Sequence, residues 1–296
     1  MEVQNALRIV MLGKYGSGIS SLANTILGEN YFEINSLSDS ETRFSQSKTK
    51  SVQGRVLTLI DSSGLFLPGR SEEDVKASRL RCMIECAPGP HAFLIVLKVE
   101  KFTEQEEDII TQICKLFSED ALKYAAVVFT KGDQLPEGMK ISKFVDDSKA
   151  LSELVRKCGG RCHVFDNKYW KQTQQDEYRS NQFQVAELLK SIDQIVKMHS
   201  GGYYTNNRLQ EVESEIQTAQ EQIRESSENM VEEDIREQAK RRFFERSLEC
   251  RQRLSSMFRW VMRLVVPGLL AIVVGVIGSK LKKFLYERIY DPWNEH

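Results

Sequence analysis

A glycine-rich stretch near the start of the chain constrains the fold more than any other part of the sequence. The stretch, GKYGSGISS at residues 13–21, directly follows the apolar run Leu7 to Leu12 and opens a segment of helical character. Its spacing is that of a phosphate-binding P-loop, G-x-x-x-x-G-K-[ST], with Ile19 where the pattern has lysine. A strand that leads through glycines into a helix presents backbone N–H groups and the positive end of the helix dipole to an anion. The stretch therefore predicts a phosphate site that lacks its usual side-chain cation.

Residues 7–198 alternate between short apolar runs and longer amphipathic segments. We expect strands at Leu7–Leu12, Val56–Ile60, Phe93–Leu97, Ala125–Phe129 and His163–Phe165. We expect helices at Ser20–Leu27, Glu72–Glu85, Thr103–Phe117, Ser142–Lys157 and Phe183–Met198. The alternation predicts an α/β fold with a doubly wound, mostly parallel sheet, in which ligands bind beyond the carboxyl ends of the strands.

The tetrapeptide Asp61-Ser62-Ser63-Gly64 directly follows the second expected strand and has the spacing D-x-x-G. In a P-loop nucleotide site, backbone N–H groups of the glycine-rich loop hold the phosphates, and the hydroxyl residue that ends the pattern, here Ser20, ligates Mg²⁺. Such a site also needs a carboxylate that steadies the metal ion and a glycine N–H that contacts the terminal phosphate. Asp61 and Gly64 are the candidates for these two roles.

A second motif, Thr130-Lys131-Gly132-Asp133, follows the fourth expected strand and has the pattern [NT]-K-x-D. A carboxylate at the last position can accept hydrogen bonds from both the N1–H and the amino group of guanine, which adenine cannot offer. The stem of Lys131 is then available to cover the purine. After the last expected strand, Asp166-Asn167 could contact the base or form an ordinary Asx turn. Together these motifs predict guanine-nucleotide binding.

The composition changes after Gly201-Gly202, where the α/β pattern ends. Residues spaced alternately three and four apart form a heptad seam: Leu209, Val212, Ile216, Ala219, Ile223, Ser226 and Met230. About three heptads are the lower limit for a coiled coil. Two arrangements are open, namely pairing with another chain and a long helix that folds back on the α/β domain.

An apolar segment near the C-terminus, Leu264–Gly278, contains fifteen uncharged residues. As a helix it would span about 22 Å, less than the roughly 30 Å of a hydrocarbon core, but Met257–Arg263 can lengthen it. Basic residues flank both ends, which favours a membrane anchor over a buried soluble helix. The net charge of −1 conceals a segregation, because acidic residues crowd positions 211–237 and basic residues crowd positions 240–263. The basic residues would lie near anionic lipid.

The N-terminus has no apolar run of signal-peptide length, and the six cysteines are scattered without C-x-x-C spacing. These features predict reduced thiols and a tail-anchored protein on the cytosolic face of an intracellular membrane. The expected divisions are a G domain at 5–198, a helical or coiled-coil extension at 203–256, the anchor at 257–280 and a short tail at 281–296. We expect no nucleic-acid partner.

These motifs, with four further stretches, resemble those of the immunity-associated GTPases, the GIMAP family. The further stretches are NTILG at 24–28, PGPHAF at 88–93, FTE at 102–104 and CHVFDN at 162–167. The resemblance covers about residues 5–198, and the helical extension with its apolar end is similar to that of membrane-anchored members. It implies a G domain related to septins and plastid-import GTPases, in which nucleotide loading promotes dimerisation across the nucleotide face and assembly on membranes.

The resemblance also implies GTP or GDP and Mg²⁺ as cofactors, and the same chain or other GIMAP-like G domains as partners. By the same match, Thr42 would be the switch threonine that ligates Mg²⁺ together with Ser20. The expected nucleotide contacts are Gly13, Lys14, Tyr15, Gly16, Ser17, Gly18, Ile19, Ser20, Ser21, Thr42, Asp61, Gly64, Thr130, Lys131, Asp133 and Asn167.

Three positions depart from the family's pattern. Ile19 replaces the P-loop lysine, Ser63 replaces the proline of D-T-P-G, and Lys101 stands where Gly-Arg precedes the aromatic-Thr-Glu stretch. Loss of the lysine removes a charge-assisted contact worth about 1.5–3 kcal/mol, or a ten- to hundredfold change in affinity. We therefore expect weakened nucleotide binding and slow or absent hydrolysis. Two alternatives stay open: a competent GTPase that uses Lys14 or a cation from a dimer partner, and an interaction scaffold that binds no nucleotide.

Overall fold

The computed structural model describes residues 6–34, 45–62, 65–67, 69–170, 177–226 and 230–265, with side chains as far as Glu249. The chain divides into two compact units, Met1–Glu213 and Ser214–His296.

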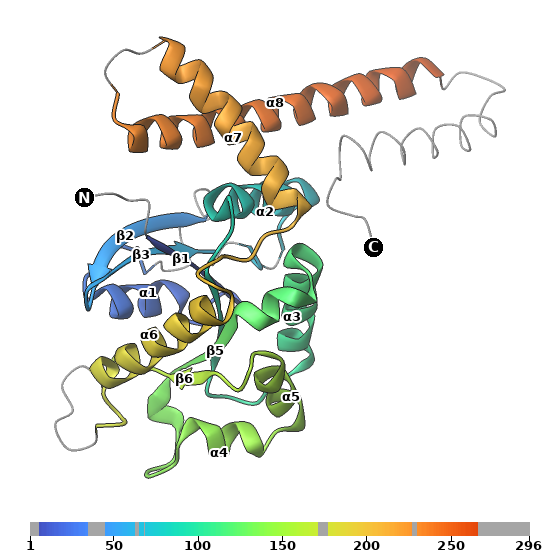
Figure 1. The fold of residues 1–296 in the computed structure, drawn as a ribbon. Helices are drawn as coiled ribbons and strands as arrows, with labels where there is room; N and C mark the ends of the chain where they lie inside the picture. Colours follow the sequence, from blue (N-terminus) through green and yellow to red (C-terminus); the bar gives the residue numbers. More distant parts are fainter. Residues whose placement is uncertain are drawn as a thin grey trace. The chain divides into compact units, whose positions relative to one another are not determined.

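A six-stranded sheet forms the centre of the first unit, in the order β2-β3-β1-β4-β5-β6 (Figure 1). Its strands are β1 (Leu7–Gly13), β2 (Gln46–Val52), β3 (Arg55–Asp61), β4 (Ala92–Lys98), β5 (Ala125–Thr130) and β6 (Cys162–Val164). Neighbouring strands run parallel except β2, which is antiparallel to β3. The carboxyl ends of the five parallel strands therefore meet at one edge of the sheet, and all the predicted motifs follow these ends.

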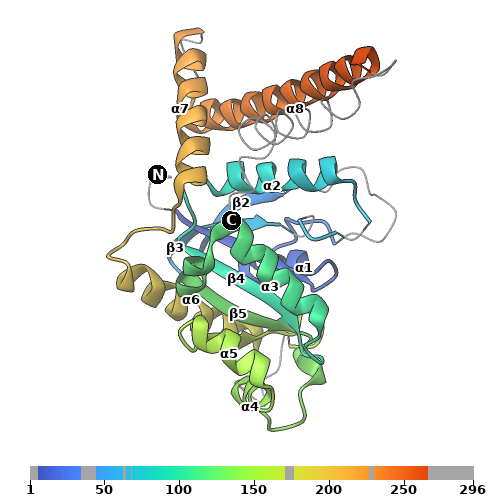
Figure 2. The same cartoon turned by 90° about the vertical axis from the view of Figure 1, so that its right-hand side faces the viewer.

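Helices cover both faces of the sheet (Figures 1 and 2). On one face, α1 (Ile19–Leu27) and α6 (Asn181–Met198) pack on alternate strand residues in a large apolar core. On the other face lie α2 (Glu72–Cys86) and α3 (Glu104–Phe117). Short 3₁₀ segments, η2 (Glu119–Tyr124) and η3 (Gly132–Gln134), flank β5. The predicted doubly wound α/β fold is confirmed for this unit.

The five predicted strands are present, but β2 was not predicted. Its sequence, QSKTKSV, is almost entirely polar, and most of its side chains are exposed or half-buried at the edge of the sheet. Such a strand lacks the apolar alternation on which sequence patterns depend. A tight turn at Gln53 and Gly54, both with positive φ, reverses the chain and pairs β2 with β3.

The single helix predicted at Ser142–Lys157 is wrong, because the structure has two helices there. They are α4 (Ile141–Asp146) and α5 (Lys149–Lys157). The chain leaves the first helix at Asp147, and the Ser148 hydroxyl accepts a hydrogen bond from the Leu151 N–H at 3.4 Å. Ser148 therefore acts as an N-cap that starts a second helix.

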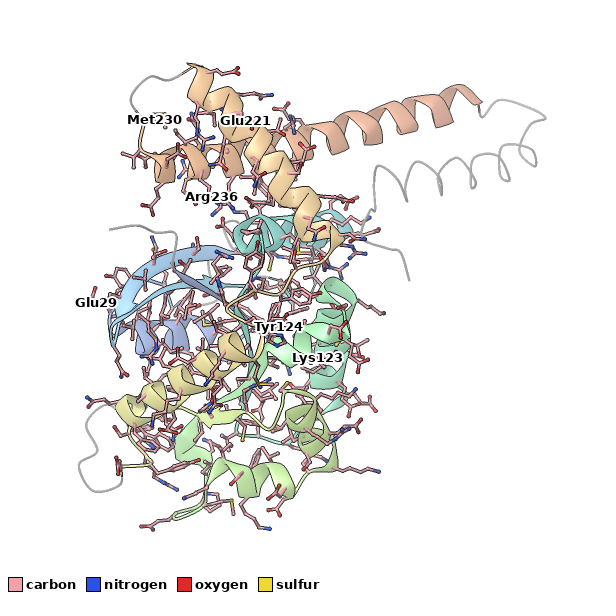
Figure 3. All side chains as sticks on the ribbon, in the orientation of Figure 1. Glu29, Lys123, Tyr124, Glu221, Met230 and Arg236 are labelled. Atoms are coloured by element: carbon pink, nitrogen blue, oxygen red, sulfur yellow. The ribbon has the colours of Figure 1, made fainter. Side chains whose placement is uncertain are left out.

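The heptad seam falls on α7 (Asn207–Ser226), which is followed by α8 (Glu232–Val265). In the second unit the two helices pair with each other. Arg224 pairs with Glu232, and Arg246 pairs with Glu215. Arg236 of α8, which is labelled in Figure 3, donates a hydrogen bond to Gln220 of α7. The seam residue Ile223 and Ala239 of α8 are fully buried. The heptad pattern thus marks the apolar side of a helix that has a partner within its own chain.

Residues 257–265 of the predicted anchor continue α8, and the rest of it lies outside the described residues. Among the residues that the structure describes, no helix combines the length and the apolarity needed to span a bilayer.

Candidate functional site

The phosphate loop runs from the end of β1 into α1, as the sequence predicted. Gly16 and Gly18 have φ values of 77° and 89°, which side chains rarely permit. A Cβ on Gly13 would lie 2.4 Å from the backbone oxygen of Val96, so only glycine fits there. The Ser17 N–H donates to the Lys14 oxygen at 2.9 Å and closes the loop. The buried Ser17 hydroxyl has no hydrogen-bond partner among the described residues, which leaves a polar group for a ligand.

Ser20, a predicted Mg²⁺ ligand, meets Asp61, the carboxylate expected to steady the metal ion, beside this loop. The Ser20 hydroxyl, in the first turn of α1, donates a hydrogen bond to Oδ2 of Asp61 at 2.6 Å. Asp61 ends β3 and is buried. A hydroxyl and a carboxylate oxygen at this separation are suitable ligands for Mg²⁺. The residues present therefore fit the predicted ion.

The base motif is tied directly to the phosphate loop. The Thr130 hydroxyl, at the end of β5, donates to the backbone oxygen of Ser17 at 2.6 Å. Lys131 takes the left-handed conformation, with φ of 59°. A Cβ on Gly132 would lie 2.6 Å from the ring of Trp170, a buried side chain that the sequence reasoning missed. The motif is thus held at both sides, and its last residue, Asp133, is exposed.

Asp166 has a structural role that the sequence left open. It is buried, and its carboxylate accepts hydrogen bonds from the N–H groups of Lys168, at 2.9 Å, and Tyr169, so it forms an Asx turn. A hydrogen bond with Asp166, together with burial and charge repulsion, raises the pKa of Asp133. Burial alone would raise the pKa of Asp166, but its hydrogen bonds outweigh burial and lower it. Asp166 therefore keeps its charge more readily than Asp133 beside it.

Asn167 lies between the phosphate loop and the base motif. The Thr25 hydroxyl of α1 donates to Asn167 Oδ1 at 2.9 Å, and a Cβ on Gly18 would lie 3.6 Å from Asn167 Nδ2. The structure thus brings Asn167 to the predicted site, with Thr25 as a support that the sequence reasoning did not identify.

Ile19 occupies the lysine position as a core residue. Its side chain is only 2% exposed and belongs to the apolar cluster between the sheet and helices α1 and α6. The loop therefore presents no cation from this position. Thr42 and Gly64, the other expected contacts to Mg²⁺ and phosphate, lie outside the described residues.

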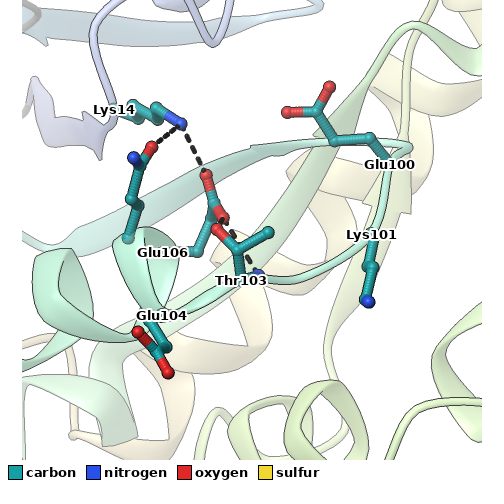
Figure 4. Close-up of a pocket in the computed structure, with 7 residues that line it drawn as sticks. Lys14, Glu100, Lys101, Thr103, Glu104 and Glu106 are labelled. Carbon is teal, nitrogen blue, oxygen red and sulfur yellow. Dashed lines mark hydrogen bonds and ion pairs between the residues drawn. The ribbon is translucent and has the colours of Figure 1, made fainter.

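Lys14, the remaining cation of the loop, is held by helix α3 (Figure 4). Its ammonium group donates to Gln105 Oε1 at 2.5 Å and to Glu106 Oε1 at 3.2 Å. Lys14 and these partners line an open pocket of about 570 Å³ together with Glu100, Lys101, Thr103 and Glu104. The side chains of Lys101 and Glu104 point away from Lys14.

The stretch Pro88–Phe93, which carries part of the family resemblance, lies at the opposite edge of the sheet from the phosphate loop. It holds the segment that leaves α6: the Tyr204 N–H donates to the Pro90 oxygen at 2.8 Å, and Arg8 lies over the Tyr203 ring. A Cβ on Gly89 would lie 1.9 Å from the Tyr204 oxygen. The Tyr204 ring contacts Phe93, Phe117 and Tyr124 edge-on, and Tyr124 stacks on His199. We call Pro88–His91 the linker seat, because it contacts Tyr203 and Tyr204 in the linker between α6 and α7.

Solved structures share the fold of the first unit. Toc33 from Arabidopsis thaliana in complex with GDP and Mg²⁺ is similar with a TM-score of 0.53 at 16% identity, covering 69% of this chain and 89% of that chain. A dimerization-deficient mutant of the same protein has a TM-score of 0.52, also at 16% identity, and covers 66% of this chain and 86% of that chain.

Sequence comparisons are more specific. GTPase IMAP family member 8 of Homo sapiens is 30% identical over 200 residues, which cover 68% of this chain and 29% of that protein. Immune-associated nucleotide-binding protein 8 of Arabidopsis thaliana is 32% identical over 212 residues, which cover 70% of this chain and 58% of that protein. The match thus spans less than two thirds of each relative. The family model described as the AIG1 family matches residues 7–224. The chain therefore belongs to the AIG1 family, in agreement with the resemblance to immunity-associated GTPases.

Proposed function

We propose that this chain binds GTP and GDP together with Mg²⁺, with reduced affinity, and hydrolyses GTP slowly or not at all. One observation supports the proposal: Ser20 bonds to Asp61 and Thr130 bonds to Ser17 of the glycine-rich loop, while Ile19 of the same loop is buried in the core. Such a site can hold a nucleotide, but it lacks the P-loop lysine, whose charge would stabilise the phosphate that is transferred.

The roles of the residues follow from their positions. The N–H groups of residues 13–20 would hold the phosphates, Ser20 and Asp61 would hold Mg²⁺, and Asp133 would read the guanine edge. When bound, Mg²⁺ neutralises charge on the β- and γ-phosphates. Asn167 would pack against the nucleotide from the side of Thr25.

Calorimetric titration of the full chain with GDP and with a non-hydrolysable GTP analogue, in Mg²⁺, tests binding. Micromolar binding of both, with ADP at least about a hundredfold weaker, is the expected result. Ser20→Ala should lose the Mg²⁺ dependence, whereas Ser152→Ala, which removes a hydroxyl from α5, should behave as wild type. Absence of binding at millimolar nucleotide would leave the interaction scaffold as the function.

The output of the nucleotide site, in this proposal, is self-association or association with related G domains. The support is that a solved relative in fold, Toc33, is described with a dimerization-deficient mutant. Single-turnover GTP hydrolysis at several protein concentrations tests this point. A rate that rises with concentration and lies well above background would contradict slow hydrolysis and favour a cation supplied by the partner.

We further propose a C-terminal anchor that holds the protein on the cytosolic face of an intracellular membrane, with divisions near 198, 256 and 280. The support is the apolar run at 264–278 with basic flanks. Fractionation of cells that express the full chain or a chain ending at 256 tests it. The shorter chain should leave the membrane pellet, and its retention there would contradict the anchor.

A further inference from the structure

The pairing of Lys14 with helix α3 affects the relative affinity of the proposed site for GTP and GDP. Lys14 is the only lysine or arginine among residues 13–21. Its stem starts within the phosphate loop, yet its ammonium group is bound by Gln105 and Glu106. With Ile19 in the core, no other side chain of the loop can bring a positive charge to a terminal phosphate. Lys14 would have to leave α3 to do so.

Glu106 is a well-fixed acceptor for this lysine. It is 7% exposed, and its Oε2 accepts from the Thr103 N–H at 3.1 Å, with the Thr103 hydroxyl as a second donor. The bond from the Thr103 N–H belongs to the capping box that begins α3. Burial alone would raise the pKa of Glu106, but the hydrogen bonds from Thr103 and Lys14 outweigh burial and hold the pKa below its usual value. Glu106 is therefore ionised at neutral pH and cannot easily turn away.

We propose that Glu106 is a latch that holds the Lys14 ammonium on α3 and so determines how strongly the site prefers GTP to GDP. This inference rests on the proposed nucleotide site. Glu106 disfavours the third phosphate in two ways: it competes for Lys14, and its own negative charge faces the same pocket that Lys14 lines. GDP, which carries less charge and ends before that position, is affected less.

The variant Glu106→Gln separates these effects from folding. Glutamine keeps a carbonyl oxygen for Thr103, and a capping box accepts Gln as well as Glu. The negative charge is lost, and the amide NH2 takes the place of the Oε1 that accepts from Lys14, so Lys14 keeps only the neutral Gln105 as an acceptor. Glu104→Gln is the matched control, because Glu104 lies in the same first turn and lines the same pocket but points away from Lys14 (Figure 4).

The experiment is calorimetric titration of the full chain with GDP and with a non-hydrolysable GTP analogue. For Glu106→Gln the affinity for the analogue should rise about tenfold, with less than about a threefold change for GDP. Adding Lys14→Met should cancel this gain, because the released cation is then absent. Thermal unfolding should show that all variants remain folded.

Three results would overturn the latch: equal gains in Glu106→Gln and Glu104→Gln, a gain that survives Lys14→Met, or no gain in a protein whose wild type binds both nucleotides. These differ from failure of the proposed function, in which neither wild type nor variants bind GDP at millimolar concentration. Binding that appears only in Glu106→Gln would support the latch.

Discussion

The Thr130 hydroxyl lies 2.6 Å from the backbone oxygen of Ser17, so the motif expected to read the base also fixes the phosphate loop. The two motifs are separated by more than a hundred residues in sequence, but the parallel order of β1, β4 and β5 places their ends close together. Neither motif can shift without disturbing the other.

We predict that Thr130→Val lowers both stability and nucleotide affinity. Valine preserves the shape but removes the donor to Ser17, which leaves a buried carbonyl unsatisfied at a cost of about 1–3 kcal/mol. Urea denaturation measures the first effect, and titration with GDP should show about a tenfold weaker affinity. Thr49→Val, which removes a hydroxyl from the exposed pair with Thr58, is the control and should change neither quantity by more than about 0.5 kcal/mol.

Ile19→Lys should restore the missing cation. The lysine stem can remain in the apolar surroundings of Ile19 while the ammonium group reaches the phosphates, so GTP affinity should rise ten- to hundredfold, about 1.5–3 kcal/mol. Stability without nucleotide should fall by about 1–3 kcal/mol, because the core loses a buried apolar side chain. Ile19→Met keeps the volume without the charge, and an equal gain in affinity for Ile19→Met would exclude the electrostatic explanation.

Asp133→Asn should change the base that the site accepts. The amide offers one acceptor and one donor in place of two acceptors, so guanine nucleotides should bind at least about a hundredfold more weakly. Xanthine carries a carbonyl where guanine carries an amino group, and XDP should therefore bind the variant better than GDP does. Competition between GDP and XDP measures the preference, with Asp147→Asn as a control on the exposed end of α4. Unchanged GDP binding would show that Asp133 does not read the base.

Stability should fall in mild acid because His163 is buried. Burial lowers the pKa of His163 to about 4, a shift that the charge of Glu187 offsets only in part. The unfolded chain takes up this proton near pH 6.5, whereas the folded chain resists until about pH 4. The stabilising contribution is therefore complete above pH 6.5 and is lost as the pH falls through this window.

Between pH 7 and pH 5 the loss due to His163 should be about 2 kcal/mol. His163→Gln, which keeps a polar partner for Ser191, should show a correspondingly flatter dependence in urea unfolding at the two pH values. Equal slopes for variant and wild type would contradict the assignment. Burial and the charge of Arg8 also lower the pKa of His91 to about 4, so some slope should remain in the variant.

Sequence patterns predicted the parts of the site that are encoded locally. A glycine loop after an apolar strand, and a polar tetrapeptide at a strand end, can each be recognised from a few neighbouring residues. The parallel strands of the sheet then bring Ser20 and Asp61 together, as expected. The pattern could not reveal that Lys14 pairs with Glu106, because these residues meet only when α3 packs beside β1. It also could not predict β2, whose polar edge position gives no apolar signal.

Strand β4 connects the linker seat to the residues that bind Lys14. Pro88–His91 immediately precede this strand, and Glu100 to Glu106 follow it. The residues that contact Tyr204 and those that bind Lys14 therefore lie beyond opposite ends of one strand. Six of the seven residues of β4 are buried, and hydrogen bonds join it to β1 and β5 on both sides. Such a strand does not bend easily. It therefore joins, through one buried element, the segment that binds the Tyr204 N–H to the segment that binds Lys14.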